Sequence, residues 1–132
     1  MVFDKKNASL LYFVTDECVY RINDKNKNAE KISTGLEKNT KNNINLLPLK
    51  ENLYLLRNRN LYKLDNLGKY WLHLYGDLEN IVILDAEVDV NQQFIYLLTH
   101  KRSKQILLFD GEKIAKELAP KDIDLKILSK LY

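Results

Sequence analysis

The fold of this chain is decided by the stretch Asn52-Leu53-Tyr54-Leu55-Leu56-Arg57-Asn58-Arg59-Asn60-Leu61-Tyr62-Lys63-Leu64-Asp65, in which two apolar runs flank the polar pair Asn58-Arg59. Apolar runs of this kind recur along the chain; they are short, rich in Tyr, Phe, Ile and Val, and bounded by turn-type residues. Such runs are typical of β-strands. Two strands joined by so short a polar connection predict a tight hairpin.

The same pair of runs occurs three times, at a spacing of 42 residues. The first run of each copy is centred on a tyrosine anchor, which is Tyr12, Tyr54 or Tyr96. The second run contains Tyr20 in the first copy and Tyr62 in the second, again 42 residues apart. In the third copy the second run arrives three residues late, which a longer loop at 100–104 explains. Equal spacings over matching strings indicate an internal repeat, and a repeat constrains the whole fold.

Two further apolar runs complete each full copy. One follows the hairpin, at Ala29–Ser33, Tyr70–Tyr75 and Lys113–Leu118, after turns such as Asn66-Leu67-Gly68 and Asp110-Gly111. The other precedes the anchor in copies two and three, at Ile44–Leu49 and Ile81–Val90, and we expect the first copy to lack it. Ile114–Leu118 and Ile123–Leu131 also suit short helices, although isolated helices of that length are marginal. The repeat favours a strand for Ile114–Leu118.

Four short strands recurring every ~40–45 residues are the signature of β-propeller blades. The sequence therefore predicts an all-β chain of about three antiparallel four-stranded blades, at about 8–36, 43–76 and 80–119. Segment 121–132 would start a fourth blade or supply a closing strand. Propellers close with ~4–8 blades, so the predicted blades do not close by themselves. Either the chain begins a longer propeller, or it closes a six-bladed dimer, or a separate partner completes it.

One motif in the repeat points to a known superfamily. Leu107-Leu108-Phe109-Asp110-Gly111 stands where WD-repeat propellers have their closing hydrophobic-Trp-Asp strand, and Tyr62-Lys63-Leu64-Asp65 matches more weakly. The chain resembles that superfamily in degenerate form, over nearly its whole length as architecture. It departs from the family in having no Gly-His pair and no Trp before either aspartate. Trp71 lies in a different strand, where we expect it to fill the packing between blades together with Tyr70. The resemblance implies the N-terminal part of a larger propeller scaffold.

The composition excludes several classes of protein. The 132 residues suffice for one domain, and 45% hydrophobic residues is a normal globular value. With 21 Lys and Arg against 18 Asp and Glu, the net charge of +3 does not by itself imply nucleic acid. Cys18, the single cysteine, excludes an internal disulfide framework. No apolar run reaches the ~18–20 residues of a membrane span. Residues 1–6 lack the apolar region of a secretory signal, so we expect an intracellular protein, cytoplasmic or nuclear.

Acidic side chains alternate along one predicted strand. The two-residue period of a strand places Asp85, Glu87 and Asp89 on one face and Val88 and Val90 on the other. In a propeller this acidic face would line the central channel, where it would hold a cation or a basic peptide. A solvated channel wall is the simpler interpretation.

Basic side chains gather at the tips of two predicted hairpins. Arg57 and Arg59 flank one tip, and the equivalent tip of the next copy carries His100, Lys101, Arg102 and Lys104. Together they form a candidate rim for phosphate, RNA or an acidic peptide. Asp16 and Glu17 stand at the same tip of the first copy, which argues against a uniformly basic rim. Nucleic acid bound there would be released steeply by salt.

No pattern in the sequence predicts catalysis, a cofactor or a metal. His73 and His100 have no paired ligand at a metal-binding spacing, and Cys18 has no histidine placed to activate it. We therefore predict a non-catalytic protein-interaction or scaffold module of a larger intracellular assembly. It would bind protein partners, or itself, through open strand edges, and would not contact a membrane. Two alternatives remain: a nucleic-acid-associated subunit that uses the basic rim, and a fragment of a propeller enzyme or ligand-binding protein whose site lies outside this chain.

Overall fold

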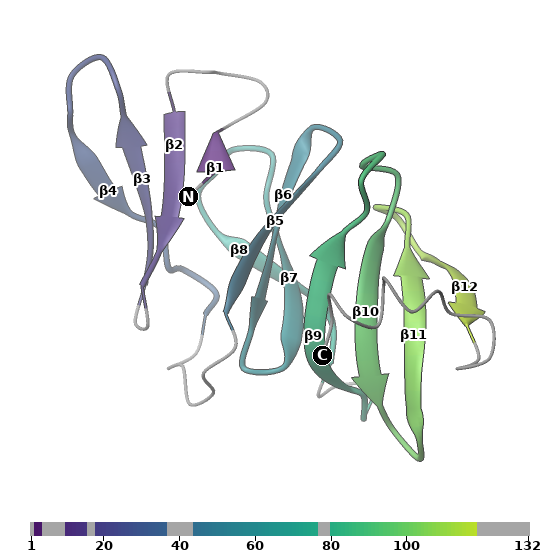
Figure 1. Cartoon of the computed structure of the whole chain (residues 1–132). Coiled ribbons are helices and arrows are strands. Elements are labelled where there is room, and N and C mark those ends of the chain that lie inside the picture. The colour runs from purple at the N-terminus through teal and green to yellow at the C-terminus, as the bar shows by residue number, and fades with distance from the viewer. Residues whose placement is uncertain (1, 4–9, 16–17, 37–43, 77–79, 119–132) are drawn as a thin grey trace.

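The chain folds into three separate antiparallel sheets of four strands each (Figure 1). The computed structural model describes residues 2–3, 10–15, 18–36, 44–76 and 80–118. The first sheet contains β1 (Val2–Phe3), β2 (Leu10–Val14), β3 (Val19–Asn23) and β4 (Ala29–Lys31). The second contains β5 (Asn45–Leu49), β6 (Asn52–Arg57), β7 (Asn60–Leu64) and β8 (Trp71–Tyr75). The third contains β9 (Val82–Val88), β10 (Ile95–His100), β11 (Lys104–Phe109) and β12 (Ile114–Leu118).

This architecture confirms the predicted all-β class and the antiparallel sheets. Ile114–Leu118 forms a strand, as the repeat required, and pairs with β11. Within the described residues no sheet closes on itself. The segment predicted at 121–132, which contains Ile123–Leu131, lies outside the described residues, as do Asp16 and Glu17.

The first sheet has one strand more than the sequence predicts. Val2 pairs with Tyr12 and Phe3 with Leu11, so β1 completes the sheet ahead of residue 8. A two-residue strand has too few positions to show a period, and only its pairing with β2 defines it.

The strand register reproduces the repeat seen in the sequence. Tyr12 lies opposite Arg21, and Tyr54 lies opposite Lys63, at the same separation along the chain. Tyr96 lies opposite Leu108, three residues further on, because the β10–β11 loop is longer. The β6–β7 hairpin turns through Asn58 and Arg59, with φ angles of 52° and 61°. Two adjacent residues of positive φ make the type I′ turn that suits the twist of a hairpin.

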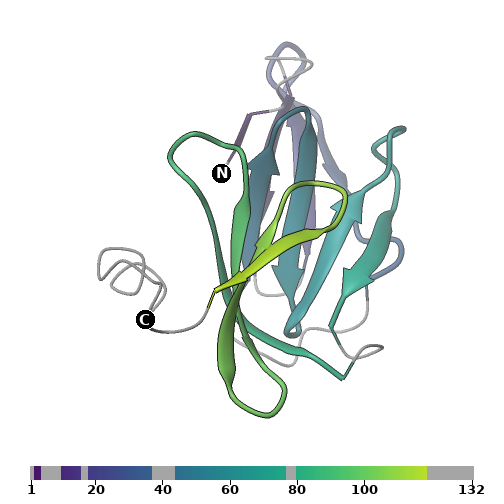
Figure 2. The ribbon, with the colours of Figure 1, turned by 90° about the vertical axis from the view of Figure 1, so that its right-hand side faces the viewer.

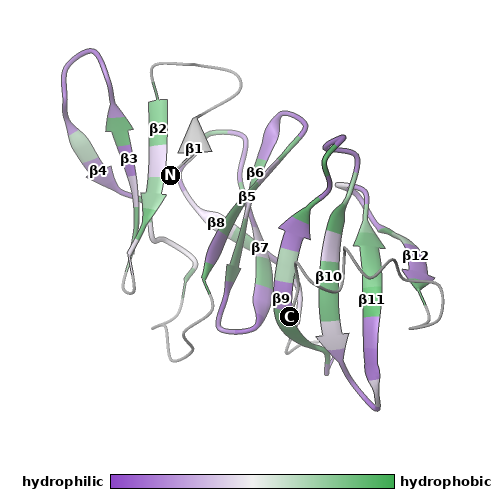
Figure 3. Cartoon of the chain, in the orientation of Figure 1, coloured by the Kyte–Doolittle hydropathy of each residue, from purple (hydrophilic) through white to green (hydrophobic). Residues whose placement is uncertain are grey.

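The sheets lie one behind another (Figure 2). They pack through apolar faces. We call the face that carries the tyrosine anchor the front face of each sheet, and the opposite face the back face. The front of the first sheet packs on the back of the second, in a cluster that joins Tyr12 and Val19 to Leu55 and Trp71. The front of the second packs on the back of the third in the same way. Apolar residues fill the strand centres and hydrophilic residues the hairpin turns (Figure 3).

An Asn or Asp side chain closes the turn after the third strand of every sheet. Asp65 Oδ1 accepts the backbone N–H groups of Lys69 and Tyr70, and Asp110 Oδ1 accepts those of Glu112 and Lys113. The corresponding Asn23 accepts the N–H of Lys25 at 2.9 Å. Side chains of this type compete for backbone donors in turns, which explains their recurrence at this position.

These turn carboxylates predict a pH dependence of stability. The N–H groups of Lys113 and Glu112 hold the pKa of Asp110 below its usual value. For Asp65, desolvation opposes this effect, but the N–H groups of Lys69 and Tyr70 outweigh it and its pKa is also lowered. Because the folded pKa lies below the unfolded value of ~3.9, the stabilisation is present above that pH and is lost as pH falls through the folded value.

The urea midpoint of the protein should therefore fall as the solution is acidified below about pH 4. In Asp65→Asn and Asp110→Asn the amide oxygen accepts the same donors without titrating, as Asn23 does in the first sheet. Part of the acid-induced fall should disappear in these variants. An unchanged dependence on pH would show that the two turns do not contribute to it.

Candidate interaction surfaces

Buried tyrosine anchors join each sheet to the next one along the chain. Tyr54 is fully buried, its ring meets Phe109 edge-on at 5.4 Å, and its hydroxyl donates to the Gly111 carbonyl at 3.0 Å. Burial raises the pKa of Tyr54, so the phenol keeps its proton and remains a donor. In the preceding interface Tyr12 is also buried, and Arg21 Nη1 donates to the Gly68 carbonyl at 3.0 Å. On each of these two front faces, one side chain thus donates a hydrogen bond to the turn between the third and fourth strands of the following sheet.

Trp71 holds the outer strands of the first two sheets together. Its indole Nε1–H donates to the Ile32 carbonyl at 3.0 Å, and its backbone N–H donates to the Thr34 carbonyl at 2.9 Å. Gly35 lies so close that a Cβ there would be 2.4 Å from the Trp71 carbonyl oxygen. Trp71 is 3% exposed and fills the packing between sheets, as expected. Tyr70 does not: it is 43% exposed, because the adjacent position of a strand points the other way.

Two apolar faces have no neighbouring sheet among the described residues. On the back of the first sheet Phe13 and Tyr20 stack at 5.2 Å and 17°, between Leu11 and Ile22. All four side chains are half-buried, and none belongs to the apolar clusters that the described residues form. On the front of the third sheet Leu98 and Ile106 are already buried, at 4% and 1% exposed. The described members of their cluster all come from that sheet: Leu84, Tyr96, Leu98, Ile106, Leu108 and Leu118. The described residues of no other sheet complete either face.

The acidic residues of β9 do not form one continuous row. Asp85 lies opposite Leu98 and Glu87 opposite Tyr96, which places both on the front of the third sheet. Asp89 follows the end of the strand and instead accepts the N–H groups of Gln93 and Phe94 in a turn. Val88 packs in the core, but Val90 is 87% exposed because the strand ends at Val88. A cation or peptide site at Asp85 and Glu87 stays a prediction.

The basic rim loses one of its predicted members. Arg57 is 3% exposed, because the two-residue period places it on the back of the second sheet with Leu55. The remaining residues are exposed: Arg59, His100, Lys101, Arg102 and Lys104. Their two hairpin tips are linked, since the Ile83 N–H donates to the Arg59 carbonyl and the neighbouring Val82 pairs with His100. The exposed cations therefore occupy adjacent tips, without Arg57.

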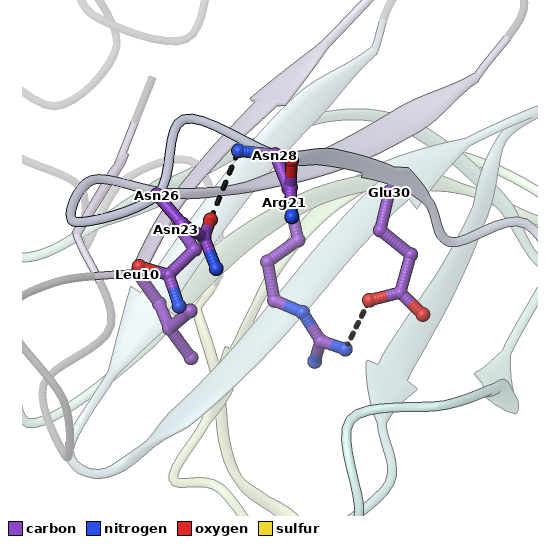
Figure 4. A pocket seen from close by; sticks show the side chains of 6 residues that line it. All are labelled: Leu10, Arg21, Asn23, Asn26, Asn28 and Glu30. Carbon is purple, nitrogen blue, oxygen red and sulfur yellow. Dashed lines mark hydrogen bonds and ion pairs between the residues drawn. The ribbon is translucent and has the colours of Figure 1, made fainter.

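A pocket of about 440 Å³ lies beside the β3–β4 turn (Figure 4). It is lined by Leu10, Arg21, Asn23, Asn26, Asn28 and Glu30. Arg21 is paired with Glu30 at 2.7 Å while its other nitrogen holds the Gly68 carbonyl. Burial acts to lower the pKa of Arg21, but the hydrogen bonds of Glu30 and Tyr12 outweigh it, so the guanidinium stays charged. Its charge serves the contact between sheets, a role that no pattern in the sequence indicates.

The described residues hold no group of three or more His, Cys, Asp and Glu that would suit a metal ion. His73 Nε2 lies 2.9 Å from Asn60 Oδ1, and its ring meets Tyr62 edge-on. Cys18 is a buried free thiol. The described part of the chain also has no helix of the length and apolarity that would cross a membrane.

Comparison with known proteins finds no match: no family model, no curated protein and no solved structure is significantly similar to this chain.

Proposed function

We propose that this chain is a propeller segment that serves as a non-catalytic protein-interaction module, with its three sheets as blades. The observation that carries the proposal is the apolar back face of the first sheet, where Phe13 and Tyr20 stack without a sheet against them among the described residues. In the other two sheets the same face is covered by the front of a neighbouring sheet.

Apolar surface of this kind favours association. Each Å² removed from water contributes about 25 cal/mol, and contiguous apolar patches on soluble domains mark interaction sites. The degenerate WD-like strand endings at Asp65 and Asp110 support the same proposal, because propellers of that superfamily scaffold assemblies. The alternative of a nucleic-acid-associated subunit rests on the exposed cations at the two hairpin tips, and the burial of Arg57 weakens it. In the remaining alternative, the chain is a fragment of a propeller enzyme or ligand-binding protein, and the catalytic or ligand site lies in blades outside this chain.

The proposal is tested by recovering bound proteins from the source cells with the tagged chain and with Phe13→Asp. The proteins that wild type recovers should be lost from Phe13→Asp and retained by Val90→Asp, which adds the same charge at an 87% exposed site. A direct interaction must then be reproduced with purified components. Equal recovery by all three chains would contradict the proposal, and nuclease-sensitive recovery would favour the nucleic-acid alternative.

A further inference from the structure

We infer that the protein partner of this module carries an acidic segment, which binds across two neighbouring hairpin tips. We call these the cationic tips, the β6–β7 and β10–β11 turns, whose exposed basic residues are Arg59, His100, Lys101, Arg102 and Lys104. This inference rests on the proposed function, because it names the chemistry of the protein partner. It adds a contact surface separate from the apolar back face of the first sheet.

The two tips lie next to each other at one edge of the row of sheets (Figure 1). The Ile83 N–H donates to the Arg59 carbonyl at 3.2 Å, and the preceding residue, Val82, pairs with His100. Neighbouring strands are ~4.8 Å apart, so two such steps place the backbones of Arg59 and His100 roughly 10 Å apart. Lys104 lies opposite His100 across the β10–β11 hairpin and extends the surface by one more strand. The cations of two different sheets therefore form one surface.

The charged side chains of this surface have one sign. Residues 57–60, 81–83 and 99–105, which form the two tips and the strand between them, include no Asp or Glu. Further along β9, Asp85 accepts the backbone N–H of Ala86 at 2.8 Å. Both ion pairs that the described residues form lie in the first sheet, away from these tips. An anionic ligand that reaches the cationic tips therefore meets basic side chains from both sheets.

Exposed cations of this kind suit a chain of carboxylates better than a single anion. One exposed ion pair contributes only about 0.2–1 kcal/mol, so a lone carboxylate or phosphate would bind weakly. Several carboxylates on one peptide add their contributions. An extended peptide rises ~3.3 Å per residue, so about four residues span the roughly 10 Å between Arg59 and His100. A short acidic segment can therefore contact both tips at once.

The same surface is less suited to nucleic acid. Proteins that bind single strands combine a basic groove with aromatic side chains on which the bases stack. The residues of the two tips and of the strand between them include no Phe, Tyr or Trp. Arg57, the further cation beside these tips, is buried. An acidic peptide needs only the exposed charges that are present.

The test measures binding of fluorescein-labelled octaglutamate to the full chain by fluorescence anisotropy. Wild type should bind it, and less tightly when NaCl is raised from about 50 to about 200 mM, because salt screens exposed charges. Lys101→Glu/Arg102→Glu should weaken binding by about tenfold or more, and Arg59→Glu on the other sheet by about threefold. Lys25→Glu/Lys69→Glu is the matched control. It changes the net charge of the chain equally, at exposed turns after the third strands of the first two sheets, and should bind as wild type does.

Circular dichroism and Trp71 fluorescence check folding, and Lys101→Ala/Arg102→Ala replaces a charge reversal that fails this check. No binding by wild type, equal binding by the two charge-reversed double variants, or unchanged binding by Arg59→Glu would each overturn the inference. Labelled octauridylate bound more tightly than octaglutamate, through the same residues, would overturn it in favour of nucleic acid. If the peptide did not bind but Phe13→Asp still lost proteins in the recovery experiment, the proposed function would stand while this inference failed.

Discussion

Replacing Tyr54 with alanine should lower the free energy of unfolding by about 3–5 kcal/mol, the usual loss for removing a large buried aromatic side chain. Tyr54 is fully buried between the second and third sheets, where Phe109 packs edge-on against it. Alanine would leave a cavity between two sheets that share no backbone ladder, so the walls can close only by moving a whole sheet. The change is measured by urea unfolding, followed by circular dichroism.

Tyr54→Phe separates packing from hydrogen bonding at the same position. It keeps the ring and removes only the donor to the Gly111 carbonyl, which is worth about 1 kcal/mol. Leu67→Ala is the matched surface control, because Leu67 is 72% exposed and its truncation should change stability by less than about 0.5 kcal/mol. A Tyr54→Ala protein as stable as this control would mean that the second and third sheets do not pack as described.

Trp71→Ala should cost a similar ~3–5 kcal/mol, by loosening the interface between the first and second sheets. Trp71 fills the cluster that contains Tyr12, Val19 and Leu55, and its indole N–H holds the Ile32 carbonyl. Its backbone N–H, which donates to Thr34, survives the substitution and retains part of the contact. Urea unfolding followed by circular dichroism measures the loss, since this variant has no tryptophan.

Trp71→Phe isolates the indole donor. Phenylalanine retains most of the packing but leaves the carbonyl of Ile32 without this buried donor, at a cost of about 1–3 kcal/mol. Leu72→Ala serves as the neighbouring control, because Leu72 is 43% exposed. If Trp71→Ala and Leu72→Ala were equally stable, Trp71 would not hold the two sheets together.

The two interfaces should behave as separate contributions to stability. In stacked repeats each unit contacts only its neighbours, and stability is approximately a sum of unit and interface energies. Tyr54 belongs to the cluster between the second and third sheets and Trp71 to the cluster between the first and second. Their effects should therefore be nearly additive in a double variant, as for distant sites with no shared partner.

Part of the candidate surface was visible in the sequence. The exposed cations Lys101, Arg102 and Lys104 fall in a polar hairpin tip. A turn between two apolar strands lies on the surface of a protein, so its side chains face solvent. Arg57 stands next to such a tip in the sequence, yet its strand period places it on a covered face. For Asp89 the alternation continues past Val88 in the sequence, but the strand ends at Val88.

The local structure of this protein follows from its sequence. Its 42-residue repeat, the alternation of apolar residues and the turn residues Asn58, Asp65 and Asp110 define the strands and hairpins, because strand period and turn chemistry are local properties. Which faces are covered depends on tertiary packing, since burial depends on the sheet that packs against each face. This packing buries Arg57 and leaves Tyr70 exposed. The strand β1 is too short to be recognised in the sequence, and its pairing with β2 defines it. The back of the first sheet and the front of the third have no neighbouring sheet among the described residues.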